Sequence, residues 1–207
     1  MPFVSVEGID GSGKSTQVEK LVLRLEAAGL DVLRTKEPDG GHIGQSVRSI
    51  MVTKLASPLS ALEEVLLVSA ARVDHVRNVI RPALSAGRWV VSDRFIDSSF
   101  ALQVIGGGVA EATYDAIASE VVGDTMPDLT IILDLTEEVA LGRRRARHSG
   151  TGTADPAEAS RNFHRIRDGF LEVARRYPRR CRVIDASVTE ERVHEAIWQE
   201  VRALLGP

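Results

Sequence analysis

A glycine-rich stretch close to the start of the chain constrains its fold more than any other feature. The pattern G-x-x-x-x-G-K-[ST] is filled completely by Gly8, Ile9, Asp10, Gly11, Ser12, Gly13, Lys14 and Ser15. In this pattern backbone N–H groups surround phosphate oxygens, the lysine reaches the β- and γ-phosphates, and the last hydroxyl binds Mg²⁺. The β-branched run Phe3–Glu7 precedes it and an amphipathic segment follows, as the motif requires. The sequence therefore predicts a phosphate-binding loop between a strand and a helix.

Apolar runs bounded by turn residues recur along the chain. After Phe3–Glu7, the runs that read as buried parallel strands are Asp31–Thr35, Trp89–Ser92, Leu129–Leu135 and Arg182–Asp185. Between them, Lys14–Ala28 carries one apolar helical stripe, and Ser60–Ala86 reads as a long helix. Thr136 and Thr189 are placed as N-caps of two later helices, the second running through Leu205.

Strands that alternate with helices indicate a parallel sheet with right-handed crossovers. We expect an α/β, three-layer P-loop NTPase fold with a five-stranded parallel sheet flanked by helices, forming one domain over residues 1–207. The segment at about 148–160 (HSGTGTADPAEAS) is small, polar and free of Arg and Lys. It is interpreted either as a surface connection or as a lid over an active site.

Composition excludes several classes of protein. The formal charge of −3 lacks the basic surplus of a nucleic-acid coat, so no nucleic acid is expected as a partner. The longest purely apolar runs are only of the size of Val65–Val68, and neither a membrane span nor a signal peptide is visible. We therefore expect no membrane partner and a cytoplasmic location. Cys181 is the only cysteine, which excludes an intramolecular disulfide. The chain has 22 Arg against 4 Lys, a skew that fits either phosphate recognition or codon bias.

A second strand end narrows the enzyme class. Asp93-Arg94 follows the apolar run directly, where an aspartate can hold Mg²⁺ as the second acidic element of P-loop enzymes. A surface ion pair is the alternative interpretation of these two residues. The guanine-reading tetrapeptide N-K-x-D does not occur, which disfavours a GTPase, and the chain is short for a motor ATPase. A kinase is the class that remains favoured.

Several ordered blocks resemble the thymidylate kinase family of nucleoside monophosphate kinases over nearly the whole chain. They are GIDGSGKST (8–16), TKEPDGG (35–41) with Arg48, SAARVDHV (69–76), VVSDRF (90–95), MPDLTIILDL (126–135) and RVIDAS (182–187). The resemblance implies transfer of the ATP γ-phosphoryl group to dTMP, giving dTDP and ADP, with Mg²⁺ and commonly as a homodimer. The partners it implies are small-molecule nucleotides.

The resemblance also implies roles for individual residues. It makes Asp10, Lys14 and Arg94 catalytic, places Mg²⁺ at Ser15 and Asp93, and extends the ATP site through Thr16 to Ala186 and Ser187. The residues that it places around the acceptor nucleotide are Asp10, Glu37, Pro38, Arg48, Val68, Arg72, Arg94, Ser98, Ser99, Leu102 and Gln103. Of these, Arg48 and Arg94 match arginines that clamp the acceptor phosphate, and Arg72 matches the arginine that hydrogen-bonds the thymine base.

The chain departs from the family pattern at three places. Val68 and Leu102 occupy positions that are usually aromatic, which removes base stacking worth about 1–3 kcal/mol per base. The family's catalytic arginine lies in the loop or in the lid, but here the loop has Gly11 and the lid has no arginine. We expect Arg147 or Arg143, which share one helix face just before the lid, to reach the transferring phosphate. Arg161, after the lid, is a further candidate for the catalytic arginine. The alternative interpretation of Arg143 and Arg147 is that they form a solvated helix face.

These departures leave two other functions open. The chain can be a kinase for another or a modified nucleoside monophosphate, as Val68 and Leu102 suggest. It can also be an ATP-binding module impaired in catalysis, as the arginine-free lid suggests, although the complete loop and Asp93-Arg94 argue against this.

Overall fold

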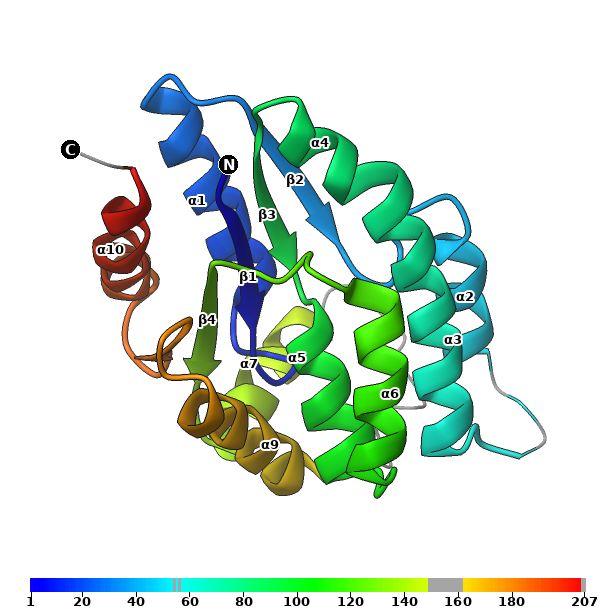
Figure 1. Ribbon diagram of the computed structural model, residues 1–207. Helices are drawn as coiled ribbons and strands as arrows, with labels where there is room; N and C mark the ends of the chain where they lie inside the picture. Colours follow the sequence, from blue (N-terminus) through cyan, green and yellow to red (C-terminus); the bar gives the residue numbers. More distant parts are fainter. Residues whose placement is uncertain (54, 56, 149–161, 206–207) are drawn as a thin grey trace.

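A five-stranded parallel sheet forms the centre of the computed structural model, which describes residues 1–53, 55, 57–148 and 162–205 (Figure 1). Its strands are β1 (Phe3–Glu7), β2 (Val32–Lys36), β3 (Trp89–Asp93), β4 (Leu129–Asp134) and β5 (Cys181–Asp185). Their order is β2-β3-β1-β4-β5, and every neighbouring pair is parallel. The predicted five-stranded α/β fold is confirmed, and each strand lies within one residue of its predicted ends.

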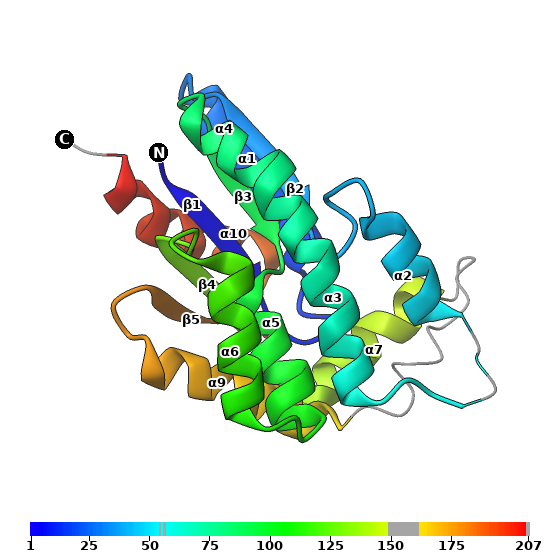
Figure 2. The same cartoon turned by 45° about the vertical axis from the view of Figure 1, so that its right-hand side comes forward.

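Helices cover both faces of this sheet (Figures 1 and 2). They are α1 (Lys14–Ala27), α2 (Gly44–Val52), α3 (Ala61–His75), α4 (Arg81–Ser85), α5 (Ile96–Ser99), α6 (Glu111–Val122), α7 (Glu137–His148), α9 (Phe163–Arg176) and α10 (Glu190–Val201). Helices α1 and α10 contact each other on one face, whereas α4 and α9 contact strands on the other. Within the described residues, no helix is long and apolar enough to cross a membrane.

The long helix predicted over Ser60–Ala86 is a continuous run with one irregular turn. Ser60 caps it through a capping box, in which its hydroxyl accepts from the Glu63 N–H and the Glu63 carboxylate accepts from the Ser60 N–H. A π-helical turn, Val76–Ile80, then separates α3 from α4, just before Pro82. Proline has no N–H for the helix ladder, and a widened turn relieves the clash of its ring with the preceding carbonyl.

Burial explains why the strands are visible in the sequence. Strand β1 and all but the last residue of β4 are buried, whereas the edge strands β2 and β5 each have only two buried positions among more exposed ones. Thr136 and Thr189 precede α7 and α10 as predicted, and the Thr189 hydroxyl accepts from the Arg192 N–H. The polar loops that follow the strands gather at their carboxyl ends, where α/β sheets bind ligands.

Candidate active site

The glycine-rich loop joins β1 to α1 at this edge of the sheet. Lys14 is buried, and its Nζ donates to the carbonyl oxygens of Gly8 (3.1 Å) and Ile9 (3.0 Å). Burial lowers the pKa of Lys14, the charge of Arg94 lowers it further, and nearby carboxylates oppose the shift. The Ser12 hydroxyl is also buried and has no hydrogen-bond partner among the described residues. A lysine held by its own loop and an unpaired hydroxyl are groups that phosphate oxygens would satisfy.

Gly11 fixes how closely the loop packs against α7. Its φ is +96°, in the region that favours glycine, and a Cβ placed on it would lie 2.6 Å from the Ala140 carbonyl oxygen. Any side chain at position 11 therefore displaces the helix. The same contact sets α7, which carries the half-buried Arg143, beside the loop.

Ser15 and Asp93 form the pair that suits a magnesium ion. The Ser15 hydroxyl donates to Asp93 Oδ2 over 2.6 Å, which brings the start of α1 and the end of β3 together. Mg²⁺ prefers oxygen ligands and is usually bound by one or two protein groups together with phosphates. No group of three or more potential ligands among His, Cys, Asp and Glu occurs in the described residues. The Ser15 hydroxyl and the Asp93 carboxylate fit this kind of donor set.

Arg94 links the loop to the segment that follows β3. It has a φ of 73°, which is unusual for a residue with a side chain, and the Ser92 hydroxyl donates to its carbonyl oxygen over 2.7 Å. Its guanidinium forms an ion pair with Asp10 and donates to the Gly8 carbonyl (3.2 Å) and the Ser98 hydroxyl (3.0 Å). Burial disfavours its charge, but attraction from Asp10 and other carboxylates outweighs burial and raises the pKa of Arg94. Arg94 therefore stays charged and fixed beside the loop.

Glu7 holds the segment that follows Arg94 through two buried hydrogen bonds. It is completely buried, and its carboxylate accepts from the Phe95 N–H and the Ser98 hydroxyl, both over 2.6 Å. Burial, followed by the charge of Asp97, raises the pKa of Glu7 to about 8. Sequence analysis did not single out Glu7, because a glutamate at the end of an apolar strand reads as an exposed polar residue.

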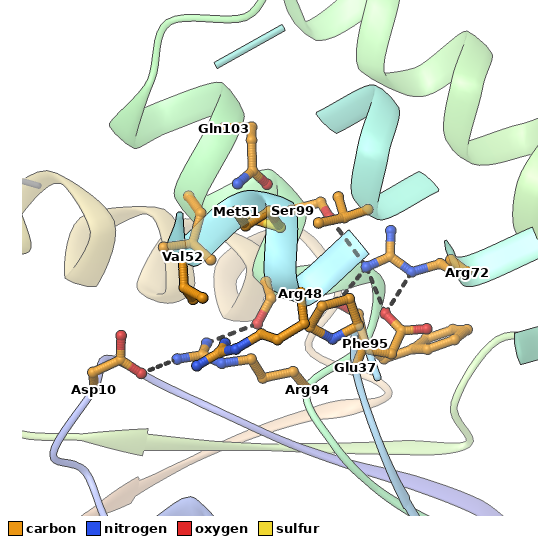
Figure 3. Close-up of a pocket in the computed structure, with 14 residues that line it drawn as sticks. Asp10, Glu37, Arg48, Met51, Val52, Arg72, Arg94, Phe95, Ser99 and Gln103 are labelled. Carbon is orange, nitrogen blue, oxygen red and sulfur yellow. Dashed lines mark hydrogen bonds and ion pairs between the residues drawn. The ribbon is translucent and has the colours of Figure 1, made fainter. Parts of the chain in front are cut away.

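One pocket gathers the residues expected around the acceptor nucleotide, as Figure 3 shows. All eleven predicted acceptor residues line it, namely Asp10, Glu37, Pro38, Arg48, Val68, Arg72, Arg94, Ser98, Ser99, Leu102 and Gln103. The residues that the sequence analysis missed are Met51, Val52 and Phe95. Met51 and Val52 follow Arg48 by three and four residues on α2, so helical spacing was a signal for them.

Two buried polar atoms of pocket residues have no hydrogen-bond partner within the described part of the chain. Arg72 is almost fully buried, and its Nε donates to Glu37 Oε2 (2.7 Å) while Nη2 donates to the Phe95 carbonyl and the Ser99 hydroxyl (both 3.1 Å). Its Nη1 has no partner among the described residues. Gln103 donates from Nε2 to Glu64 (2.9 Å), and its buried Oε1 has no described partner. The pocket thus offers one unpaired donor and one unpaired acceptor.

The remaining predicted residues lie around the loop or outside the description. Ala186 is buried after β5 with its N–H bonded to the Asp134 carbonyl (2.7 Å), and the Ser187 hydroxyl donates to Asp185 (2.6 Å). Their part in ATP binding stays a prediction. Arg147 is on α7, but its side chain lies outside the described residues, as do Arg161 and the lid segment 149–160.

A phosphate-binding loop at the end of a central strand, an oxygen pair suited to Mg²⁺, and an adjoining arginine-rich pocket define a P-loop phosphotransferase. Comparison with known proteins narrows this class. The family model described as Thymidylate kinase matches residues 6–197, so the chain belongs to the thymidylate kinase family, as the sequence predicted.

Curated relatives and a solved structure agree with this assignment. Thymidylate kinases from Caulobacter vibrioides and Bradyrhizobium sp. (strain ORS 278) are 45% and 44% identical, covering 99% and 98% of this chain and 97% and 90% of their own lengths. The crystal structure of thymidylate kinase from Ehrlichia chaffeensis has a TM-score of 0.77 at 33% identity, covering 97% of this chain and 98% of that one. The predicted phosphotransferase class is confirmed.

Proposed function

We propose that this chain transfers the γ-phosphoryl group of ATP to dTMP, giving ADP and dTDP. The observation that carries the choice of acceptor is the unpaired donor of Arg72 and the unpaired acceptor of Gln103 in one pocket. Membership of the thymidylate kinase family supports the same reaction.

The hydrogen-bonding edge of thymine complements these two atoms. Thymine presents a carbonyl oxygen at C4, which accepts, beside an N3–H group, which donates. Arg72 Nη1 can only donate a hydrogen bond, so it pairs with the C4 carbonyl oxygen of thymine. Gln103 Oε1 accepts from N3–H, and the Glu64 carboxylate fixes the amide orientation because it accepts from Nε2. Cytosine reverses both groups, so it would set donor against donor and acceptor against acceptor.

The charged end of the pocket suits the phosphate of the same nucleotide. Figure 3 shows Arg48 and Arg94 toward the end of the pocket where Asp10 lies, away from Arg72. Guanidinium groups bind phosphate oxygens in pairs of parallel hydrogen bonds. An acceptor phosphate bound there faces the glycine-rich loop, where Lys14 is placed to bind the donor phosphates. Phosphoryl transfer needs mainly this positioning and charge neutralisation.

We propose that Ser15 and Asp93 hold Mg²⁺ together with the ATP phosphates, where the ion neutralises their negative charge. For the transferring phosphate we propose Arg143 or Arg147 as the arginine that contacts it. The close approach of Ala140 to Gly11 supports this, because it leaves the loop no room for an arginine and sets α7 beside it. Replacing each by alanine should lower kcat on the order of 10³-fold for the one that acts there. Near-normal kcat in both variants would show this idea to be wrong.

A panel of acceptors tests the proposed function. ADP release with dTMP, dUMP, dCMP, dGMP and UMP gives kcat/KM for each, and dTMP should be the best substrate by about tenfold or more over dCMP. Val68 and Leu102 are both half-buried and line the pocket where an aromatic ring is usual in the family. A dTMP rate no better than the others would favour a different acceptor. ADP release that ignores every added monophosphate would favour an impaired ATP-binding module.

We further propose that the enzyme acts in the cytoplasm as a homodimer. Leu62, Leu66 and Val73 are 47%, 51% and 44% exposed on α3. Their spacing of four and seven residues puts them on one helix face, which is suited to pairing with a second copy. Buried Cys181, which is free, suits a reducing compartment.

A further inference from the structure

Arg72 is bound to a buried carboxylate that lines the same pocket. Arg72 Nε and Nη2 both lie 2.7 Å from the same oxygen, Glu37 Oε2. The other oxygen, Glu37 Oε1, lies 3.1 Å from Nδ1 of His75, which is three residues beyond Arg72 on α3 and fully buried. One carboxylate therefore joins the proposed base-reading arginine to a histidine outside the set of pocket-lining residues.

The second ring nitrogen of His75 is also bound. Its Nε2 lies 2.7 Å from the Thr35 hydroxyl on β2. Because the Glu37 carboxylate accepts, Nδ1 carries the proton and donates to it. In the neutral ring the Thr35 hydroxyl then donates to Nε2. Both ring nitrogens of His75 therefore have a hydrogen-bond partner. Turning the ring would leave these nitrogens and their buried partners unpaired, so one ring orientation is favoured.

The loop after β2 closes tightly over this ring. A Cβ on Gly40 would lie 2.5 Å from His75 Nε2 and 2.7 Å from the Thr35 hydroxyl oxygen. The carboxylate of Asp74 accepts from the His42 N–H and from the Ile43 N–H, the latter over 3.3 Å. Two adjacent residues of α3 thus contact this loop: Asp74 through hydrogen bonds to its N–H groups, and His75 through close packing against Gly40. Tight packing of this kind leaves the imidazole no room to turn away from Glu37.

We propose that His75 is a positioning residue for recognition of the acceptor base, acting through Glu37 on Arg72. Glu37 Oε2 already lies 2.7 Å from both Nε and Nη2 of Arg72, so the orientation of this carboxylate fixes the plane of the guanidinium. His75 binds the other oxygen, Glu37 Oε1, and so keeps the carboxylate from turning. The guanidinium then stays in the plane in which Nη1, unpaired among the described residues, is available to the base. The inference rests on the proposed function, in which Arg72 contacts the base.

Two conservative substitutions separate the two nitrogens of His75. In His75→Asn the amide replaces Nδ1 and keeps a donor toward Glu37, whereas in His75→Gln it replaces Nε2 and keeps only the Thr35 contact. We expect His75→Gln to lower the ratio of kcat/KM for dTMP over dCMP on the order of tenfold, equivalent to about 1.4 kcal/mol, with KM for ATP unchanged. His75→Asn should retain most of the selectivity. His42→Gln, at a mostly exposed ring of the same loop, is the matched control.

The dTMP/dCMP selectivity of these variants decides whether His75 positions Arg72. A His75→Gln protein with an unchanged dTMP/dCMP ratio overturns the proposal, even if its Tm or its rates with all substrates fall together. If His75→Gln does not fold, Thr35→Val loosens the ring from its other nitrogen and should lower the same ratio; an unchanged ratio there also overturns it. Arg72→Lys separates this inference from the proposed function. Loss of selectivity in Arg72→Lys but not in His75→Gln refutes the role of His75 alone, whereas no dTMP preference in the unsubstituted protein refutes the proposed function.

Discussion

Gln103→Leu is the substitution that tests base recognition with the least disturbance of the fold. Leucine has a similar volume, and the group left behind, Glu64, is only half-buried and so can be hydrated. We therefore expect a stability change below about 1 kcal/mol. The change removes the unpaired Oε1 of a side chain that is 1% exposed, and with it the proposed acceptor for N3–H of thymine.

The expected magnitude follows from this burial. Losing a neutral hydrogen bond costs about 0.5–1.5 kcal/mol, and leaving the buried N3–H of the nucleotide without a partner raises the total to about 1–3 kcal/mol. This corresponds to a fall on the order of 5- to 150-fold in kcat/KM for dTMP. dCMP should lose nothing, because its N3 accepts and faces an acceptor in the unsubstituted pocket. The dTMP/dCMP ratio should therefore fall by at least the same factor.

ADP release with each nucleotide measures these ratios, and KM for ATP should not change. Gln199→Leu is the matched control, because the exposed Gln199 also donates from its amide to a glutamate, Glu195, on a helix far from the pocket. A folded Gln103→Leu protein that keeps the original dTMP/dCMP ratio would refute the reasoning. Equal losses with dTMP and dCMP would also contradict it, because they indicate a general disturbance of the pocket.

Three further predictions concern the loop, the buried carboxyl and the surface. Glu7 binds its proton more tightly in the folded protein, with a pKa of about 8 against 4.5, so the free energy of unfolding should fall as pH rises through that window. Urea unfolding of Glu7→Gln should show a flatter pH dependence, and an unchanged slope would contradict the assignment to Glu7. Gly11→Ala, with its Cβ 2.6 Å from the Ala140 carbonyl oxygen, should weaken ATP binding by about tenfold or more, and calorimetry showing unaltered affinity would oppose this. Leu66→Glu should convert a dimer to monomers in light scattering, because it places a charge on the exposed face of α3; the proposed dimer is wrong if the unsubstituted protein is already monomeric.

Local patterns in the sequence were enough to predict the architecture. The central strands are buried on both sides, so they appear as continuous apolar runs such as Leu129–Leu135, and the structure places β4 at Leu129–Asp134. The long helix after Ser60 was equally visible from its period and its cap. Its π-helical turn at Val76–Ile80 was not predicted, because Pro82 could have ended the helix as well as widened one turn.

The membership of the site was predictable largely through resemblance, but its contacts were not. The family resemblance named all eleven predicted acceptor residues that line the pocket, whereas Phe95, which lies inside the block VVSDRF, was not singled out. Most arginines outside the site have structural partners, as in the pairs of Arg167 with Asp134 and Arg180 with Asp97. Such pairs join residues far apart in the chain, which no local pattern encodes.

The sequence by itself determined the phosphate-binding loop, the five parallel strands and the family, because each depends on spacing between neighbouring residues. The tertiary structure decided which polar atoms are left for a ligand. Arg72 and Glu37 are 35 residues apart in the chain. Their pairing in the folded protein shows that Arg72 Nη1 has no partner among the described residues, and that His75 contacts the other oxygen of Glu37. The physical reason is that a buried polar atom is unpaired only when none of the elements packed around it supplies a partner. Which elements surround it is decided only when the chain folds.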